Sequence, residues 1–198
     1  NQEINKSIIP RKGMINAHYK DRIKFLGDDG WAWPVLEGHL DEESICYCVG
    51  AGDNISYDIA LYTNYNSNVF IIDPTEYAFE KARKKLFDPK NILNPNKIKF
   101  IKTALSDEDG KVEFRRNQSG NSYSIVKNSK QHKLNKNIDP DMLVPCKKLS
   151  TLMKENNHKK IHMLKIDIEG SEYGVINDIL DERIEIDIIN VEFHGEWL

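Results

Sequence analysis

The stretch from Ile45 to Leu61 constrains the fold of this chain more than any other. It begins with five mostly apolar residues, Ile45–Val49, which suit a strand covered on both faces in a parallel sheet. Gly50 and Gly52 follow, and glycines allow positive φ angles and the close approach of a ligand to the backbone. A helix is expected to begin at about Ser56, a plausible N-cap, and to direct its unpaired N–H groups at the turn. The stretch therefore predicts a cofactor-binding turn of an α/β protein.

Strand and helix patterns alternate along the rest of the chain. The patterns predict strands at 68–73, 97–101, 161–168 and 185–194, and helices at 76–87, 149–155 and 173–180. Asp109-Gly110 is typical of a hairpin turn, so 111–114 is expected to pair as a small extra strand. This alternation predicts a doubly wound, mainly parallel sheet with right-handed crossovers. Ligands of such sheets bind at the carboxyl ends of the strands, which selects Gly50–Asp53, Asp73, Ala104–Asp107, Asp167–Glu172 and His194.

The length of 198 residues suits one α/β domain. We expect residues 1–44 to form an N-terminal segment that packs on the core, and residues 45–198 to form the cofactor-binding domain. Trp31 and Trp33 are expected either to close the core, which we favour, or to lie over the cofactor. Residues 115–138 carry six lysines and arginines and no acid, which predicts a basic loop. Such a loop suits an anionic acceptor, and it suits equally a solvated surface loop.

Composition excludes several classes of protein. A net charge of −3 does not favour binding to nucleic acid, and no apolar run approaches the ~18 residues of a membrane span. Residues 1–13 lack the apolar core of a secretory signal. The three cysteines lack metal-binding spacing, and Cys46 and Cys48 share one face of a strand, where a core role is expected. These features predict a cytoplasmic protein.

The glycine turn does not by itself identify the cofactor. A dinucleotide fingerprint requires a third glycine, and Ile55 occupies that position. Asp73 follows the second strand, where an acid binds the ribose hydroxyls of NAD or of S-adenosylmethionine. Asp73 could instead be the N-cap of the next helix, with Pro74 as its first residue.

The residues after the fourth and fifth strands suggest a family. Leu164-Lys165-Ile166-Asp167-Ile168-Glu169-Gly170, together with Val49–Gly52, Asp73-Pro74-Thr75 and Val191–His194, resembles the FkbM family of class I S-adenosylmethionine-dependent methyltransferases. The resemblance runs from about Gly30 to His194. It implies a Rossmann-like methyltransferase fold, S-adenosylmethionine as cofactor, and O-methylation of a sugar, polysaccharide or related natural-product hydroxyl. The chain differs from the family in two ways: Cys48 stands where members carry Asp, and the fold's usual C-terminal hairpin is expected to be missing.

The resemblance and the strand-end rule together give each residue a predicted role. The cofactor is expected to contact Gly50, Ala51, Gly52, Asp53, Asp73, Pro74, Ala104, Leu105, Ser106 and Asp167. Its amino group needs a partner in place of Cys48, and the candidates are Asp53, Asp58 and Asp167. The general base is expected to be His194 or Asp167, since an imidazole titrates near neutral pH. Glu169, Glu172, Tyr123 and Lys130 are predicted to contact the acceptor.

Two alternatives concern Glu169 and Glu172. With Asp167 they could bind Mg²⁺, because hard cations take oxygen ligands. We favour a simpler role, in which they place negative charge at the N-terminus of the next helix, and we predict no metal.

Two other functions remain open at this point. An NAD-dependent oxidoreductase or epimerase would share the glycine turn and Asp73, and Tyr77 and Lys81 have the spacing of its proton relay. A non-catalytic S-adenosylmethionine-binding module would keep the fold and lack the chemistry.

Overall fold

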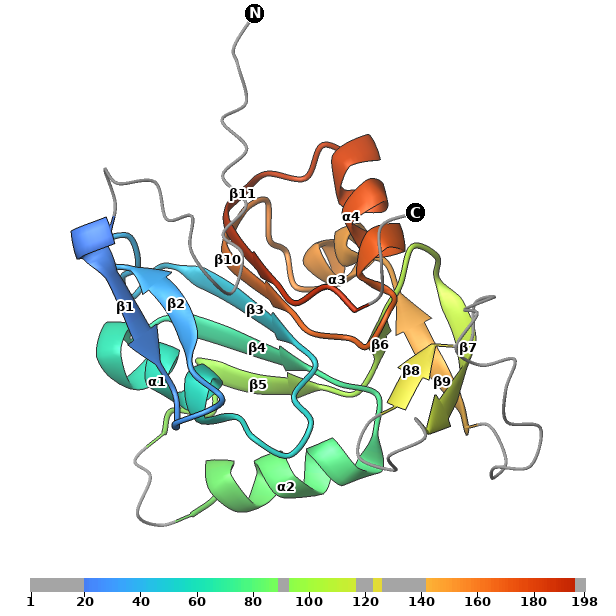
Figure 1. The fold of residues 1–198 in the computed structure, drawn as a ribbon, viewed down its shortest axis with the longest axis horizontal. Coiled ribbons are helices and arrows are strands. Elements are labelled where there is room, and N and C mark those ends of the chain that lie inside the picture. Colours follow the sequence, from blue (N-terminus) through green and yellow to red (C-terminus); the bar gives the residue numbers. More distant parts are fainter. Residues whose placement is uncertain (1–19, 89–92, 117–122, 126–141, 195–198) are drawn as a thin grey trace, which may run out of the picture.

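A parallel sheet of five strands forms the centre of the molecule (Figure 1). The computed structural model describes residues 20–88, 93–116, 123–125 and 142–194. The strands run in the order β11-β10-β3-β4-β5, and each neighbouring pair is parallel. Their bounds are β3 Ile45–Val49, β4 Asn68–Ile72, β5 Ile98–Ile101, β10 Ile161–Ile166 and β11 Ile186–Val191. The predicted α/β fold with a mainly parallel sheet is confirmed. Among the described residues, no strand extends this sheet beyond β11.

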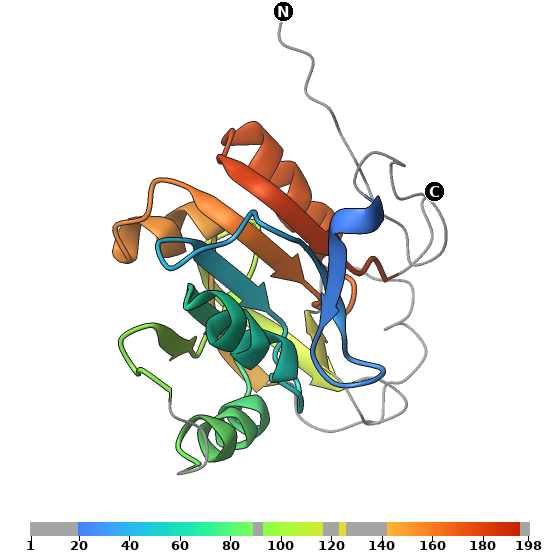
Figure 2. The ribbon, with the colours of Figure 1, turned by 90° about the vertical axis from the view of Figure 1, so that its left-hand side faces the viewer.

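Helices cover both faces of this sheet (Figures 1 and 2). Helices α1 (Ser56–Tyr65) and α2 (Glu76–Leu86) pack on one face, and α3 (Leu149–Glu155) and α4 (Glu172–Asp181) pack on the other. The alternation of side chains along β3 explains this arrangement, since Cys46 and Cys48 join the first core while Tyr47 and Val49 join the second. All four side chains are almost fully buried, because β3 lies in the middle of a sheet whose two faces are both covered by helices. The predicted core role of the two cysteines is confirmed.

A second sheet of four strands follows β5. Its order is β6-β9-β7-β8, with bounds β6 Ala104–Leu105, β7 Gly110–Arg116, β8 Tyr123–Ile125 and β9 Met142–Lys147. The predicted extra strand at 111–114 therefore exists, but the hairpin interpretation was wrong. β6 and β7 both pair with β9, which lies between them. The Asp109 carboxylate accepts hydrogen bonds from Lys148 N and Thr151 Oγ1.

Part of the predicted basic loop at 115–138 is also strand. β7 continues to Arg116, and its last residues pair with β8, in the register Arg116 to Tyr123. The backbone pairing of β8 was not visible in the sequence because it depends on a partner strand rather than on local periodicity. Lys130 and most of the loop lie outside the described residues.

The N-terminal segment forms an antiparallel hairpin of β1 (Ile23–Leu26) and β2 (Trp33–Leu36), preceded by the short 3₁₀ helix Lys20–Arg22. The hairpin is attached to the main sheet through Asn190 Nδ2, which donates to Pro34 O at 2.7 Å. Trp33 is partly buried and packs against the core, as we favoured, whereas Trp31 is 51% exposed. Residues 1–19 lie outside the described part of the chain.

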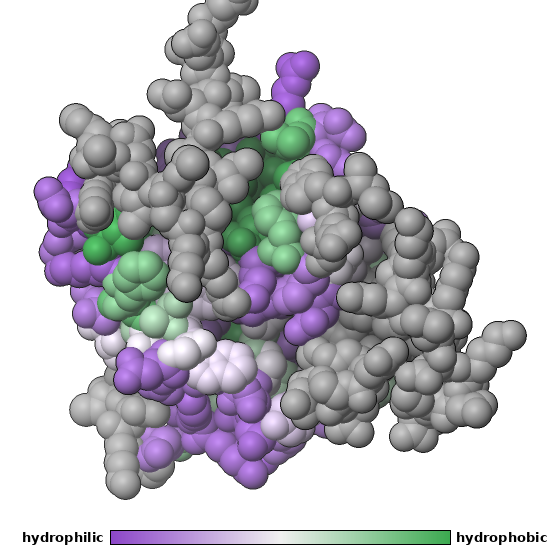
Figure 3. All heavy atoms as spheres, in the orientation of Figure 1, coloured by the Kyte–Doolittle hydropathy of each residue, from purple (hydrophilic) through white to green (hydrophobic). Residues whose placement is uncertain are grey.

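The surface of the described residues is mostly polar. In the view of Figure 3, apolar side chains gather over the β1–β2 hairpin and around β11. Phe25 of β1 is 63% exposed and Ile189 of β11 is 40% exposed. Within the described residues, no helix has the length and hydrophobicity needed to cross a membrane.

Candidate functional site

The carboxyl ends of β3, β4, β10 and β11 meet at one edge of the central sheet (Figure 1). The glycine turn follows β3, Asp73 follows β4, the loop from Asp167 follows β10, and His194 lies beyond the end of β11. A parallel sheet brings these positions together although they are far apart in the sequence.

Gly50 is required by the packing of the turn against its neighbouring strand. Its φ is +85°, and a Cβ atom there would lie 1.8 Å from the backbone oxygen of Asp167. Gly52 also has a positive φ, of +53°, but nothing lies within 4 Å of the position of its Cβ. The sequence suggested that both glycines make room for a ligand. For Gly50 the structure shows a further reason for glycine, because the backbone oxygen of Asp167, in the loop after β10, occupies the place of a Cβ atom.

Asp73 braces this turn. Its Oδ2 accepts hydrogen bonds from the backbone N–H groups of Ala51 and Gly52, at 3.1 and 3.2 Å. Its Oδ1 accepts from Thr75 N at 2.9 Å and from Thr75 Oγ1 at 2.6 Å. The carboxylate thus joins the turn after β3 to the start of α2.

The alternative in which Asp73 is the N-cap of α2 was wrong. Thr75 is the N-cap, and its side chain accepts from Ala78 N. Pro74 consequently lies before the helix rather than at its first position.

The start of α1 also differs from the prediction. Ile55 occupies the N-cap position, and Ser56 is the first residue of the helix. The side chain that accepts a hydrogen bond from Ser56 N is that of Asn54, at 2.8 Å. Ser56 Oγ instead accepts from Asp28 N, which attaches the β1–β2 hairpin to the helix.

A buried lysine, which the sequence analysis did not single out, lies beneath the turn. Lys165 Nζ donates to Gly50 O at 2.7 Å and lies 3.7 Å from Asp167 Oδ2. It also lies 5.0 Å from the centre of the Trp33 ring, within the range of a cation–π contact. Its position among the apolar residues Met163, Leu164 and Ile166 of a strand was the available signal, since buried lysines need partners.

Asp58 is buried on the first turn of α1, close to the end of β3. Its residue is 5% exposed, and its Oδ1 has no hydrogen-bond partner in the structure. Burial raises the pKa of Asp58, and the positive charge of Lys165 and a hydrogen bond from the Cys48 thiol act in the opposite direction. A carboxylate therefore lies beside Cys48, the position at which the resemblance to the FkbM family led us to expect an acid on the strand itself.

His194 is surrounded by four carboxylates. Its Nδ1 lies 2.8 Å from Glu172 Oε1, in a hydrogen bond. Its Nε2 faces Asp167 Oδ1 at 3.8 Å, Glu169 Oε2 at 3.8 Å and Glu192 Oε1 at 3.9 Å. The hydrogen bond with Glu172 and the neighbouring negative charges raise the pKa of His194 to about 9, although burial acts against them. The imidazole consequently keeps its proton near neutral pH, which removes the reason for preferring it as a general base.

Glu172 positions the His194 ring from the buried side of the site. The residue is 0% exposed, and its carboxylate accepts hydrogen bonds from Ile168 N and Gly170 N in addition to the bond with His194. These bonds hold the loop in which Glu169 has a positive φ of 56°, a strained conformation for this residue. Burial alone would raise the pKa of Glu172, but its hydrogen bonds lower it overall. The prediction that Glu172 contacts an acceptor directly was therefore wrong, because it has no exposed surface.

We expect a Glu172→Gln substitution to lower the pKa of His194 from about 9 toward its ordinary value, because the bond with Glu172 is the largest cause of the shift. A raised pKa in the folded state stabilises the fold at a pH below about 6.5 and ceases to do so as the pH rises through about 9. Stability of the parent chain should thus fall across that range in a chelating buffer, and less so in E172Q.

NMR titration of the His194 ring and urea unfolding at several pH values measure both effects. Glu155→Gln, which removes an exposed partner of Lys147, is the control and should leave the titration of His194 unchanged. An equally high pKa for His194 in E172Q would contradict the assignment.

The residues predicted to flank adenine have little free surface. Ala104 and Leu105 form β6 and are 3% and 1% exposed. Ser106 N donates to Lys147 O, and Ser106 Oγ donates to Asp107 Oδ1. Their proximity to a cofactor remains a prediction. If Ser106 binds adenine, its N–H and hydroxyl groups would have to bond to adenine as well as to Lys147 O and Asp107 Oδ1. Asp53, in contrast, is exposed beside Gly52.

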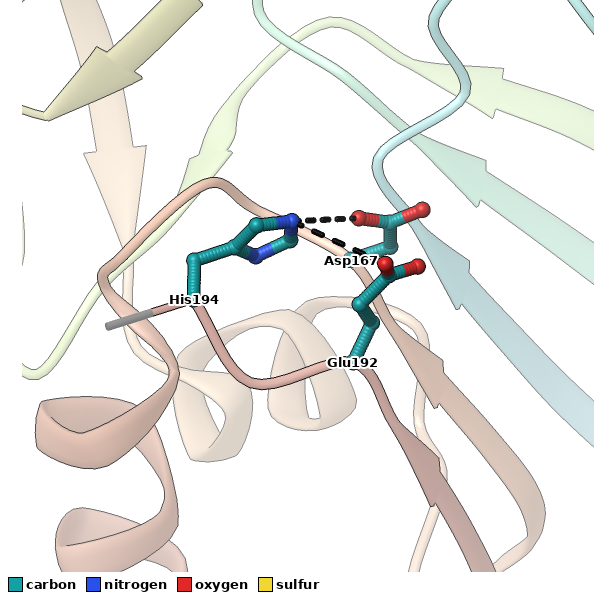
Figure 4. Close-up of side chains that lie close together, drawn as sticks. All are labelled: Asp167, Glu192 and His194. Atoms are coloured by element: carbon teal, nitrogen blue, oxygen red, sulfur yellow. Dashed lines mark ion pairs between the residues drawn. The ribbon is translucent and has the colours of Figure 1, made fainter. Parts of the chain in front are cut away.

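Glu192 belongs to this site and was absent from the predicted residues. Asp167, Glu192 and His194 offer ligand atoms that all lie within 4.8 Å of one another (Figure 4). The available signal was the spacing of Glu192 and His194, two residues apart just after a strand. This group has a spacing that could hold a metal ion, whereas the sequence analysis predicted none.

Comparison with known proteins identifies the family of this chain. The methyltransferase FkbM domain family matches residues 49–197. The chain belongs to this family. A solved methyltransferase FkbM from Methylobacillus flagellatus KT is similar over 74% of this chain and 32% of its own, with 12% sequence identity and a TM-score of 0.47. This chain therefore spans about a third of the length of that protein. No curated protein matches it. Membership of the FkbM family supports a methyltransferase activity.

Proposed function

We propose that this FkbM-family chain uses S-adenosylmethionine to methylate a hydroxyl of a sugar, polysaccharide or related natural product. The observation that carries this proposal is the shared edge of the sheet, where the turn braced by Asp73 lies next to the cluster around His194. A cofactor bound at the turn would hold its methyl group close to the carboxylates that can receive the acceptor's proton.

The residues at the turn fit S-adenosylmethionine. The backbone at Gly52 is open, which suits the methionine portion, and Asp53 is exposed beside it. The unpartnered Oδ1 of Asp58 suits the positively charged amino group, in place of the acid missing at Cys48, and because this oxygen is buried the glycine turn would have to open to admit that group. Asp73, with Pro74 beside it, would bind the ribose hydroxyls by sharing the acceptor oxygens that now hold the turn. The cofactor supplies an activated methyl group and a good leaving group.

An Asp58→Asn substitution tests the assignment of the amino group. We expect the affinity for S-adenosylmethionine to fall at least about tenfold, because a charge-assisted hydrogen bond is lost. We expect the melting temperature to stay the same or to rise, since a buried carboxylate with an unpartnered oxygen becomes a neutral amide. Calorimetry and thermal melting measure the two quantities. A loss of stability together with unchanged affinity would assign Asp58 to the fold alone.

Removal of the acceptor's proton falls to the carboxylates rather than to His194. In the reaction the hydroxyl oxygen forms a bond to the methyl carbon, the bond from that carbon to sulfur breaks, and the hydroxyl proton leaves. Because the pKa of His194 is raised to about 9, its ring is already protonated near neutral pH. Asp167 and Glu169 are partly exposed and lie beside it, so we assign the proton to them. Tyr123 and Lys130 remain predicted acceptor contacts.

The oxidoreductase alternative receives less support. Tyr77 and Lys81 both lie exposed on α2, where the Lys81 Nζ is 5.4 Å from the centre of the Tyr77 ring. That geometry is a surface cation–π contact rather than a proton relay.

Methyl transfer itself tests the proposal. The chain is incubated with S-adenosylmethionine that carries an isotopically labelled methyl group and with a panel of mono-, oligo- and polysaccharides, neutral and anionic. We expect labelled methyl ether in at least one acceptor and stoichiometric S-adenosylhomocysteine. Reduction of NAD by the same panel, without methyl transfer, would favour the oxidoreductase. Binding of the cofactor without turnover on any acceptor would favour a non-catalytic module.

A further inference from the structure

A histidine and three carboxylates converge on one point beyond the ends of β10 and β11. Figure 4 shows His194 with two of them, Asp167 and Glu192. The point is His194 Nε2, which faces carboxylate oxygens of Asp167, Glu169 and Glu192 at 3.8 to 3.9 Å. Asp167 comes from one strand end and Glu192 from the next, so the parallel sheet itself sets their separation. Cis ligands of an octahedral divalent cation lie about 3 Å apart at bond lengths near 2.1 Å. The ligand atoms of Asp167, Glu192 and His194 lie within 4.8 Å of one another, so a contraction of about 1 to 2 Å would complete such a set.

The imidazole is oriented by a residue outside this group. Glu172, fully buried, accepts a hydrogen bond from His194 Nδ1 at 2.8 Å. When a cation replaces the proton on Nε2, this bond keeps the remaining proton on Nδ1 and leaves the lone pair of Nε2 directed at the three carboxylates. A carboxylate that fixes the ring through its other nitrogen is the usual second shell of a metal-binding histidine. The arrangement of Glu172 therefore points to a ligand of Nε2, independently of the acidic residues.

The charges of the site also call for a cation. Four carboxylates surround His194, and Lys165 Nζ lies 3.7 Å from the Oδ2 atom of one of them, Asp167. Its Nζ already donates to Gly50 O, which limits how far it can neutralise the group. Asp167, Glu169 and Glu192 are partly exposed, so an ion can reach them from solvent.

We propose that Asp167, Glu192 and His194, with Glu169 beside them, bind one divalent cation of the Mn²⁺ or Mg²⁺ class. Carboxylate oxygens predominate in this ligand set, which suits hard cations, and the single imidazole favours Mn²⁺ over Mg²⁺. Glu172 is a positioning residue for this site rather than a ligand.

The role of the cation, unlike its binding, rests on the proposed function. A carboxylate is a weak base for an ordinary alcohol, and a bound cation lowers the pKa of a hydroxyl that coordinates to it. The hydroxyl oxygen then attacks the methyl carbon, and the bond between that carbon and the cofactor's sulfur breaks. The hydroxyl proton passes to Glu169 or to solvent. The cation would thus allow a carboxylate, which is a weak base, to remove the proton of the acceptor hydroxyl.

Binding of Mn²⁺ to the chelator-treated chain, followed by electron paramagnetic resonance and calorimetry, tests the proposal without cofactor or acceptor. We expect one equivalent to bind and to raise the melting temperature. His194→Gln and Glu192→Gln should each weaken binding at least about tenfold, and Glu172→Gln should weaken it about 10- to 100-fold. The control is His39→Gln, since His39 Nε2 lies 3.4 Å from a single carboxylate oxygen, of Asp187, and it should leave Mn²⁺ binding unchanged.

Two results would overturn the site: no saturable Mn²⁺ binding to the parent chain, or equal binding to the parent chain and to both H194Q and E192Q. Circular dichroism confirms that each variant is folded before titration, and E192Q, at a partly exposed strand end, provides a reading even if H194Q unfolds. The two proposals fail separately. Mn²⁺ binding without methyl transfer on any acceptor would support the cation site and contradict its role in catalysis. Methyl transfer that a chelator does not diminish would support the proposed function and contradict a role of the cation in it.

Discussion

Replacing Gly50 with alanine should destabilise the chain by about 3 to 5 kcal/mol, a large part of the stability of a typical domain. The new Cβ would lie 1.8 Å from the Asp167 backbone oxygen, so either the turn or the loop after β10 must move. The positive φ of 85° adds strain of about 1 to 2 kcal/mol for any residue with a Cβ atom. Urea unfolding measures the change, and binding of S-adenosylmethionine should be lost in whatever fraction stays folded.

Gly52→Ala is the matched control. It places a methyl group at a φ of +53° with nothing within 4 Å, so only the backbone strain of about 1 kcal/mol applies. Equal losses of stability in the two variants would show that the contact between the turn and Asp167 is not what requires Gly50.

Replacing Asp73 with alanine should have the second largest effect, and it should alter both stability and binding. The N–H groups of Ala51, Gly52 and Thr75 all lose their acceptor, and each unpaired buried donor costs about 1 to 3 kcal/mol. Water can replace part of this loss, so we expect about 3 kcal/mol in total and a fall in melting temperature of roughly 10 °C. Affinity for S-adenosylmethionine should fall at least about 100-fold, since both the turn and the ribose contact are removed.

Two further variants separate these contributions. Asp73→Asn keeps one acceptor oxygen but presents an amide N–H₂ to donors on its other side, so we expect roughly half of the loss of stability. Asp109→Ala removes another carboxylate that braces a helix start, through Lys148 N and Thr151 Oγ1, and it lies in a loop of the second sheet. It should lower stability without altering cofactor affinity. An Asp73→Ala chain that binds the cofactor within a factor of about two of the parent would contradict the ribose assignment.

The central sheet could be predicted from the sequence because its signals are local. Apolar runs such as Ile45–Val49 alternate with helical patterns, and short connections between parallel strands permit few topologies. The second sheet could not be predicted in the same way. β9 pairs with β7 across an intervening segment of more than twenty residues, and no local pattern reveals such a pairing.

The site was predictable in its location and only partly in its chemistry. The strand-end rule selected Asp73, Asp167 and His194, and the structure brings all three to one edge of the sheet. It could not show that His194 lies among four carboxylates, because Asp167, Glu169 and Glu172 follow β10 whereas His194 follows β11, and the two segments converge only in the fold. The pKa of His194 follows from that convergence, so a base chosen for its ordinary pKa was the weakest part of the prediction.

The partner of the cofactor's amino group could be narrowed to three residues from the sequence but not to one. The sequence shows that Cys48 replaces an acid, and it offers Asp53, Asp58 and Asp167 as substitutes without ranking them. The ranking comes from burial, since Asp58 alone among the three is buried beside Cys48 and has an oxygen without a hydrogen-bond partner. Asp58 lies on α1, which packs on the sheet, and sequence spacing does not reveal that a helix residue lies beside the end of a strand.

Calorimetric titration of the chain with S-adenosylmethionine, S-adenosylhomocysteine and NAD tests the central claim most directly. Binding of the first two ligands with a stoichiometry near one, weakened in Asp58→Asn and abolished in Asp73→Ala, is the result that the geometry of the glycine turn predicts. Binding of NAD with no heat from either adenosylated amino acid would contradict it.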